Sequence, residues 1–84
     1  MQPEQIEQIL SQALELDHVQ VTGEGNHFQV VAVGAMFTDL SRVKKQQAVY
    51  APLKEYIASN EIHALGIKAY TPDEWQKQQK FGQL

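Results

Sequence analysis

Apolar residues near the start of the chain recur at the spacing of an α-helix. Pro3 suits a first helical position, where a missing backbone N–H costs nothing, and Glu4 and Glu7 suit the positive end of the helix dipole. The i, i+3, i+4, i+7, i+8 spacing in QPEQIEQILSQALEL (residues 2–16) is carried by Ile6, Ile9, Leu10, Ala13 and Leu14. The pattern predicts an amphipathic N-terminal helix.

The following stretch, HVQVTGEGNHFQVVAVG (residues 18–34), changes to the two-residue alternation of β-strands. Val19 and Val21 alternate up to the turn-forming GEGN, and the alternation then resumes. After the turn, one face carries Phe28, Val30 and Ala32, and the other Val31 and Val33. Two strands joined by a glycine-rich turn predict a β-hairpin.

A helical period returns after the hairpin. In AMFTDLS we expect Phe37 and Leu40 to anchor in the core and Ser41 to cap the next helix. The stretch RVKKQQAVY then places on one helical face Val43, Gln46 or Gln47, and Tyr50.

Pro52 interrupts this helical pattern. It removes a backbone donor and disfavours helical geometry at Ala51, so we expect a break there. Leu53 and Ile57 restart the period, and turn-favouring Ser59 and Asn60 close it. The region is predicted to form two short helices or one kinked helix.

The segment HALGIKAY (residues 63–70) predicts a third strand with one buried face, formed by Leu65, Ile67 and Ala69. The other face carries Gly66, Lys68 and Tyr70.

TPDEW (residues 71–75) follows directly and has the signature of a capping box. Thr71 is the expected N-cap, Pro72 the first helical residue, and Glu74 the residue that reaches back to the cap. We expect Trp75 to anchor this helix in the core. The mostly polar remainder, residues 77–84, is predicted to fray into a mobile tail.

The order α-β-β-α-α-β-α predicts an α/β (α+β) fold, a two-layer sandwich of helices on a three-stranded sheet. Eighty-four residues form one domain, residues 1–84, because a chain this short buries a single core. The N-terminus resembles neither a secretion signal nor a membrane span, so we expect a cytoplasmic protein with no membrane partner.

Charge and cysteine content limit the chemistry further. The formal net charge of −3 removes the overall attraction to nucleic acid, although a local basic patch is compatible with it. The chain has no cysteine, which excludes thiolate nucleophiles and thiolate metal sites. No catalytic motif is present, and the cap role accounts for Asp73 and Glu74, so we expect no enzyme.

Three histidines remain as candidate metal ligands. His18 opens the first strand and is explained as a half-exposed edge residue. His27 follows the hairpin turn, and it is interpreted either as a residue that hydrogen-bonds the turn or as a metal ligand on a loop. His63 falls on the same side of the alternation as Leu65 and Ile67, and it is interpreted either as a histidine packed in the core or as a metal ligand. Two histidines cannot close a tetrahedral site, so further ligands would come from elsewhere.

Arg42, Lys44 and Lys45 cluster at the start of a predicted helix. Cations there oppose the helix dipole, so either they form a solvated face or they meet a phosphate or an acidic protein surface.

Two blocks of the chain resemble those of BolA proteins. These are NHFQVVAVGAMFTDLSRVKKQQAVY (residues 26–50) and IHALGIKAYTPDEW (residues 62–75), and the likeness extends from about residue 4 to about residue 80. The resemblance is closest to a bacterial acid-stress subgroup and implies a class II KH-like fold with a mixed sheet.

The resemblance also implies a partner and a cofactor. BolA proteins pair with a monothiol glutaredoxin and share a [2Fe-2S] cluster, which glutaredoxin and glutathione thiols hold on the other side. The family's C-terminal histidine corresponds to His63, and the loop ligand corresponds to His27. An iron-sulfur accessory protein in cluster trafficking, iron homeostasis or acid and oxidative stress is therefore the first hypothesis. Rieske-type ligation gives the precedent for imidazole on such a cluster.

Two departures from the family pattern bear on the alternatives. No histidine stands at Lys45-Gln46, and Asp39 replaces a frequent glycine. The GxxG loop by which KH domains clamp nucleic acid is missing. A DNA-binding regulator that uses Arg42, Lys44 and Lys45 is the second hypothesis, and a structural adaptor is the third.

Overall fold

The computed structural model describes the backbone of residues 1–82 and the side chains of residues 1–80. Its α-helices are α1 (Pro3–Ala13), α2 (Arg42–Tyr50), α3 (Lys54–Ala58) and α4 (Pro72–Gly82). The strands are β1 (His18–Glu24), β2 (His27–Val33) and β3 (Ala64–Tyr70), and two 3-10 turns are η1 (Ala35–Phe37) and η2 (Ala51–Leu53). The predicted α-β-β-α-α-β-α order is confirmed.

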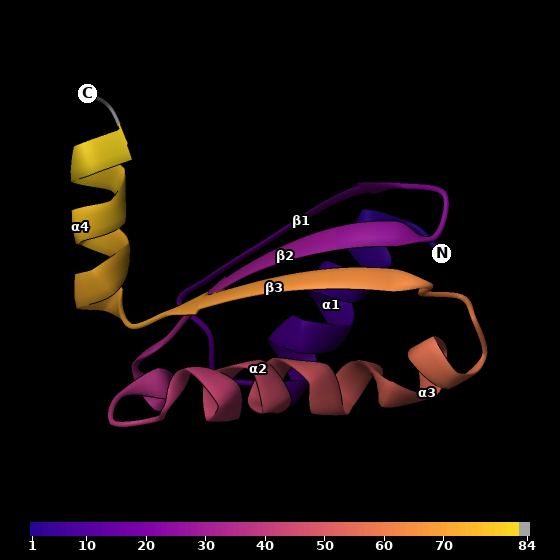
Figure 1. Cartoon of the computed structure of the whole chain (residues 1–84), viewed down its shortest axis with the longest axis horizontal. Helices are drawn as coiled ribbons and strands as arrows, with labels where there is room; N and C mark the ends of the chain where they lie inside the picture. The colour runs from indigo at the N-terminus through magenta and orange to yellow at the C-terminus, as the bar shows by residue number, and fades with distance from the viewer. Residues whose placement is uncertain (83–84) are drawn as a thin grey trace.

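The three strands form one mixed sheet in the order β1-β2-β3. β1 and β2 pair antiparallel, with Glu24 opposite His27, and β2 and β3 pair parallel, with His27 opposite Ala64. Helices α1, α2 and α3 lie on one side of this sheet, and α4 stands at its end and points away from them (Figure 1). The predicted two-layer α+β sandwich is therefore confirmed.

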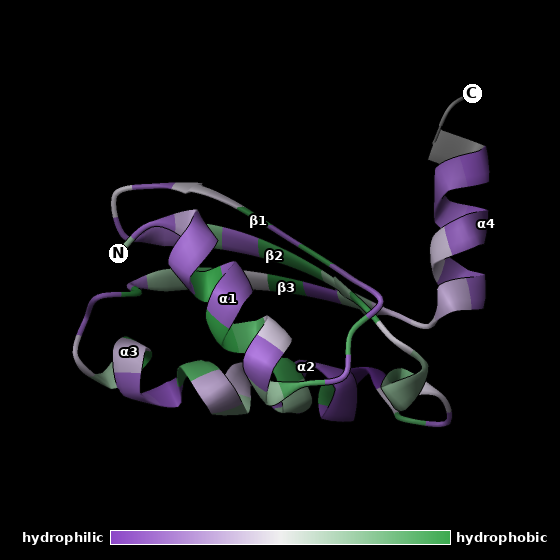
Figure 2. Cartoon of the chain, turned by 180° about the vertical axis from the view of Figure 1, so that it is seen from behind, coloured by the Kyte–Doolittle hydropathy of each residue, from purple (hydrophilic) through white to green (hydrophobic). Residues whose placement is uncertain are grey.

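The core lies between the sheet and α1, α2 and the η2 turn. Apolar positions of α1 and of the strands face this layer, and polar positions cover much of the outside (Figure 2). The buried cluster consists of Ile6, Leu10, Val21, Phe28, Val30, Ala32, Phe37, Val49, Leu53 and Ile62. At about 25 cal/mol per Å² of apolar area, burial of these side chains is the main stabilising contribution.

The hairpin turn is shorter than the GEGN segment suggested. β1 continues through Glu24, and only Gly25 and Asn26 connect the strands. Gly25 has φ +61°, which the first central residue of a type II′ turn requires and glycine adopts without strain.

Local capping follows the sequence closely. The Ser41 hydroxyl accepts a hydrogen bond from Lys44 N–H at 3.2 Å. At α4, Glu74 N–H donates to Thr71 Oγ1 at 3.2 Å, and Thr71 N–H donates to Glu74 Oε1 at 2.8 Å. Both predicted caps are confirmed, because capping depends on residues within one turn.

The break expected at Pro52 is milder than predicted. Ala51 keeps helical angles, φ −54° and ψ −47°, and the 3-10 turn η2 absorbs the missing donor between α2 and α3. The kinked-helix alternative therefore describes this region better than two separate helices.

In the described part of the predicted tail, α4 continues to Gly82. Residues 83–84 of the predicted tail lie outside the described residues.

Trp75 does not belong to the core cluster, contrary to expectation. It is half-buried and lies against the sheet face opposite the other helices. Its ring stacks on His18, with centroids 5.5 Å apart and planes at 23°, and meets Tyr70 at 5.5 Å and 43°. His18 and Tyr70 flank buried Val33 in register, so the three rings dock α4 over that residue.

The two kinds of aromatic packing should differ in energy. Phe37→Ala, in the buried core, is expected to cost about 3–5 kcal/mol. Trp75→Ala removes two aromatic pairs of about 0.5–1.5 kcal/mol each, so about 1–3 kcal/mol is expected. Urea unfolding of both variants measures the difference, and an equal loss would place Trp75 in the folding core after all.

Candidate functional site

The sheet brings His27 and His63 together at the end away from α4 (Figure 1). His27 opens β2 directly after the hairpin turn, and His63 immediately precedes β3. Because β2 and β3 run parallel with His27 opposite Ala64, the two histidines become neighbours. Their ring centroids lie 5.6 Å apart, with the planes at 37°.

Backbone hydrogen bonds fix the base of this histidine pair. The carbonyl oxygen of Asn26 accepts from His63 N–H at 2.7 Å and from Ala64 N–H at 3.2 Å. The hairpin turn and the start of β3 are thus tied at one atom. Two rings mounted on strand ends have a more constrained geometry than two rings on free loops.

The imidazole rings themselves are exposed. Among the side-chain hydrogen bonds of the described residues, none involves either ring. The interpretation of His63 as a packed core histidine is therefore wrong: it lies just before β3 rather than on the buried face of the strand.

The histidine pair offers two metal ligands and no more. Across residues 1–82 no group of three or more His, Cys, Asp or Glu side chains is placed to hold a metal. Two imidazoles suit one iron of a [2Fe-2S] cluster of the Rieske type, and the other ligands would then belong to another molecule. The donor set therefore fits a shared cluster better than a closed metal site.

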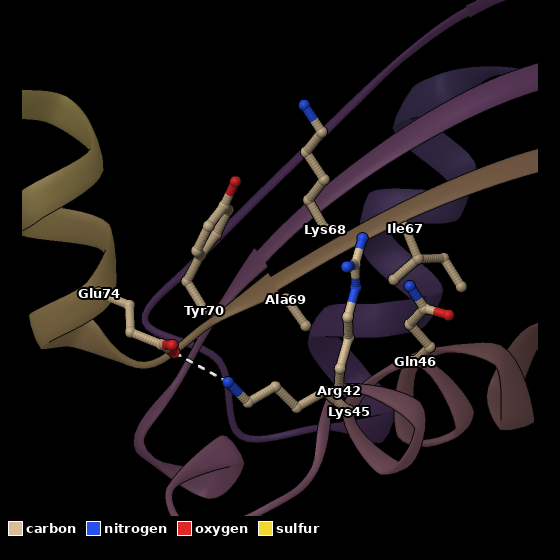
Figure 3. Close-up of a pocket in the computed structure, with 8 residues that line it drawn as sticks. All are labelled: Arg42, Lys45, Gln46, Ile67, Lys68, Ala69, Tyr70 and Glu74. Carbon is tan, nitrogen blue, oxygen red and sulfur yellow. Dashed lines mark hydrogen bonds and ion pairs between the residues drawn. The ribbon is translucent and has the colours of Figure 1, made fainter. Parts of the chain in front are cut away.

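The three candidate cations do not form one patch. Arg42 and Lys45 line a hollow between α2, β3 and α4, but Lys44 does not (Figure 3). Lys68 of β3 joins them instead. We call this the cationic hollow; its other lining residues are Gln46, Ile67, Ala69, Tyr70 and Glu74.

Glu74 moderates the charge of the cationic hollow. Its Oε1 accepts from Lys45 Nζ at 2.9 Å, in addition to the cap bond from Thr71 N–H (Figure 3). The Thr71 backbone N–H and, after it, the Lys45 ammonium hold the pKa of the Glu74 carboxyl below its ordinary value.

A second hollow continues along β3 from the cationic one, and the two share Gln46 and Ile67. Val43 and Tyr50 of α2 line it, with 62% and 41% of their surface exposed. We call this the apolar hollow; it also includes Gln47, Leu65 and Gly66. The helical face predicted for α2 exists, but it borders this hollow, and Val49 is the buried residue instead.

Sequence reasoning missed Lys68 and the second role of Glu74. The alternation of β3 separated Lys68 from Ile67 correctly, but only the strand order shows that β3 is an edge strand beside α2. Likewise, the cap explained Glu74 fully, and no local signal pointed to Lys45.

Comparison with known proteins identifies relatives over most of the chain. A family model described as BolA-like protein matches residues 2–74. Acid stress protein IbaG of Escherichia coli K12 is 58% identical over 80 residues, covering 95% of each chain. The DNA-binding transcriptional regulator BolA of Haemophilus influenzae is 38% identical over 56 residues, 67% of this chain and 53% of that protein. A BolA homologue structure from Coxiella burnetii superposes with TM-score 0.76 at 30% identity, covering 90% and 97% of the two chains.

The charge of Glu74 should make stability depend on pH. Its pKa is lower in the folded state, so its contribution is present above the unfolded pKa and is lost as pH falls through the folded one. Glu74→Gln should therefore cost about 0.5–1 kcal/mol at neutral pH, a modest value because half of the side chain is exposed. In urea unfolding at a series of pH values, the two proteins should converge as pH falls through the folded pKa of Glu74; a constant difference would contradict this role.

Proposed function

The chain belongs to the BolA-like family, and on that premise we propose that it is an iron-sulfur accessory protein. Its partner is a monothiol glutaredoxin, with which it shares a [2Fe-2S] cluster through His63 and His27. The adjacent, exposed imidazoles at 5.6 Å are the observation that carries the proposal. The role is one of holding and passing on a cluster rather than of catalysis.

The division of ligands follows from the donors available. This chain has no cysteine, so its side of the complex is limited to the two imidazoles, while glutaredoxin and glutathione supply thiolates. Ligation by neutral imidazole in place of thiolate leaves a cluster less negative and raises its potential. Backbone hydrogen bonds to Asn26 fix the strand end that carries His63, so the two rings stay neighbours without a partner.

Histidine ligation also suggests a response to acid. Ligation by histidine depends on pH, because a proton and a metal compete for the same imidazole nitrogen. Acidification therefore favours release of the cluster from this chain's side. This behaviour agrees with a role in acid stress, the property for which the relative IbaG of Escherichia coli is named.

No helix among the described residues is long and apolar enough to cross a membrane.

A nucleic-acid-binding regulator is the second candidate. The observation in its favour is that Arg42, Lys45 and Lys68 line one hollow, and the Haemophilus influenzae relative is named as DNA-binding. Against it, Lys45 is paired with Glu74, and Asp39 stands where a GxxG loop would need glycine. The hollow offers fewer free cations than phosphate binding normally uses.

The cluster proposal is tested by removing one ring at a time. Apo-protein is titrated anaerobically into cluster-loaded monothiol glutaredoxin with glutathione, and the visible circular dichroism is followed. Wild type should convert the spectrum to that of a new heterocomplex, and His63→Ala should not. His27→Ala should give an altered or less stable spectrum, because one ligand is lost.

His18→Ala is the matched control, since His18 stacks on Trp75 at the far end of the sheet. It should convert the spectrum like wild type. If the His27→Ala/His63→Ala double variant still binds glutaredoxin, with no cluster in the complex, the protein is a structural adaptor instead. An unchanged spectrum with wild type would end the cluster proposal.

The nucleic-acid candidate makes the opposite prediction. If it is right, Arg42→Glu/Lys68→Glu should weaken DNA binding strongly and reduce the magnitude of the slope of log affinity against log salt by about 0.7–0.9 per contact removed. His63→Ala and Lys44→Glu should leave binding unchanged, because neither side chain lines the cationic hollow. Fluorescence anisotropy at several salt concentrations measures this, and sensitivity to His63→Ala would contradict it.

A further inference from the structure

β3 forms one edge of the sheet, and no strand pairs with its outer side. The order β1-β2-β3 gives β3 a single neighbour. On the side that faces β2, the Tyr70 carbonyl oxygen accepts a hydrogen bond from Gly34 N–H, and Ala64 N–H donates to the carbonyl oxygen of Asn26. Backbone groups alternate along a strand, so those of the odd-numbered residues Leu65, Ile67 and Ala69 face the free edge.

The two edges of the sheet differ in the hydrogen bonds that their outward-facing backbone groups make. At the β1 edge, Val21 N–H donates to the Glu7 carboxylate at 2.9 Å. Along β3, no side-chain hydrogen bond of the described residues reaches Leu65, Ile67 or Ala69. Unpaired donors and acceptors in a row are a template for another strand.

Beside this edge runs a continuous groove made of the cationic and apolar hollows, which we call the α2–β3 groove. Its apolar part carries Val43 and Tyr50, the exposed large apolar side chains of the described residues. At one end, Arg42 rises from α2 to the edge of β3 near Ile67 and Lys68 (Figure 3). The groove therefore combines backbone donors, an apolar wall and a cationic end.

We propose that the α2–β3 groove binds an extended, acidic peptide segment of a partner protein, which adds as a fourth strand at β3. Apolar side chains of the segment pack on Val43 and Tyr50, and its carboxylates meet Arg42 and Lys68. Residues 65–70 span about 17 Å at roughly 3.3 Å per residue, so a segment of about six extended residues reaches along both hollows. Main-chain pairing of this kind gives affinity, and the side-chain pockets give specificity.

Charge favours a peptide over the other occupants. The chain carries a net charge of −3, so most of its surface repels an acidic segment. The cationic hollow, in contrast, has three cations against one carboxylate and attracts such a segment. A second copy of this chain would bring its own cations to the same edge. A nucleic acid would leave Val43 without a partner and would place phosphates beside Glu74.

The groove also continues toward the histidine pair. A third hollow, lined in part by His27 and Ala64, shares Leu65 and Gly66 with the apolar hollow. A partner segment in the groove thus approaches the histidine pair from the side of β3. Binding in the groove needs no metal, so its test is independent of the cluster proposal.

The test uses apo-protein and a fluorescein-labelled peptide, Glu-Glu-Thr-Val-Thr-Val-Thr-Ser, with the reversed sequence beside it because either strand direction suits the edge. Anisotropy gives the affinity, and amide shifts give the site. At least one peptide should bind and should shift the amides of Leu65, Ile67 and Ala69. Arg42→Glu and Val43→Ser should each weaken binding about fivefold to tenfold. Lys44→Glu, the same charge change on an exposed neighbour outside the groove, should alter it less than twofold.

Backbone methylation separates strand addition from charge alone. Methylating the peptide amides that face β3 should abolish binding, and methylating the intervening amides should not. Absence of binding, equal loss with Lys44→Glu, equal effects of both methylation patterns, or tighter binding of a single-stranded oligonucleotide that displaces the peptide would each overturn the proposal.

Discussion

The parallel pairing of β2 with β3 is the constraint on which the rest of the molecule depends. It places His27 opposite Ala64 at one end of the sheet and Val33 opposite Tyr70 at the other. A parallel pair cannot be joined by a tight turn, so the chain must cross the sheet between the strands. The crossover contains η1, α2, η2 and α3, and with α1 it covers one face and closes the core. One register thus fixes the core, the histidine pair and the position of α4.

The same pairing separates two kinds of chemistry along β3. Its beginning adjoins the exposed imidazoles of His27 and His63, which make no side-chain hydrogen bond among the described residues. Its end adjoins a group of cations, of which Lys45 is held by Glu74. The apolar hollow lies between them. A partner that covers all three regions would bring its metal ligands to one end and its acidic residues to the other.

Features that depend on residues close in sequence could be predicted from the sequence, and features that depend on distant residues could not. The caps at Ser41 and Thr71 were predictable because their partners lie three residues away. The alternation of β3 was correct, but the exposure of Val43 and Tyr50 was not foreseen, since it depends on β3 being an edge strand. Pairing of the two histidines likewise required the parallel register. Nothing in the local sequence sets that register: the residues alone named each histidine as a candidate ligand, and only the family resemblance put both on one cluster.

Asp39 shows how a departure from the family pattern is compatible with the fold. It takes φ +66°, a left-handed conformation that glycine adopts freely and that aspartate tolerates better than most other residues. The backbone path between η1 and α2 is therefore kept without the glycine. A carboxylate now occupies the position, so the loop repels phosphate rather than clamping it. The fold is preserved while a nucleic-acid function is disfavoured.

The histidine at the start of β3 can now be explained by exclusion. A side chain at position 63 is exposed, so Val or Ile there would add nothing to the core. The backbone of His63 does the structural work through Asn26, and any residue except proline could donate that hydrogen bond. Folding constrains the backbone at this position but not the ring, so the ring is available for the ligand role proposed above. The neighbouring His27 ring is likewise exposed and makes no side-chain hydrogen bond among the described residues, which suits the proposed ligation of one iron by two imidazoles.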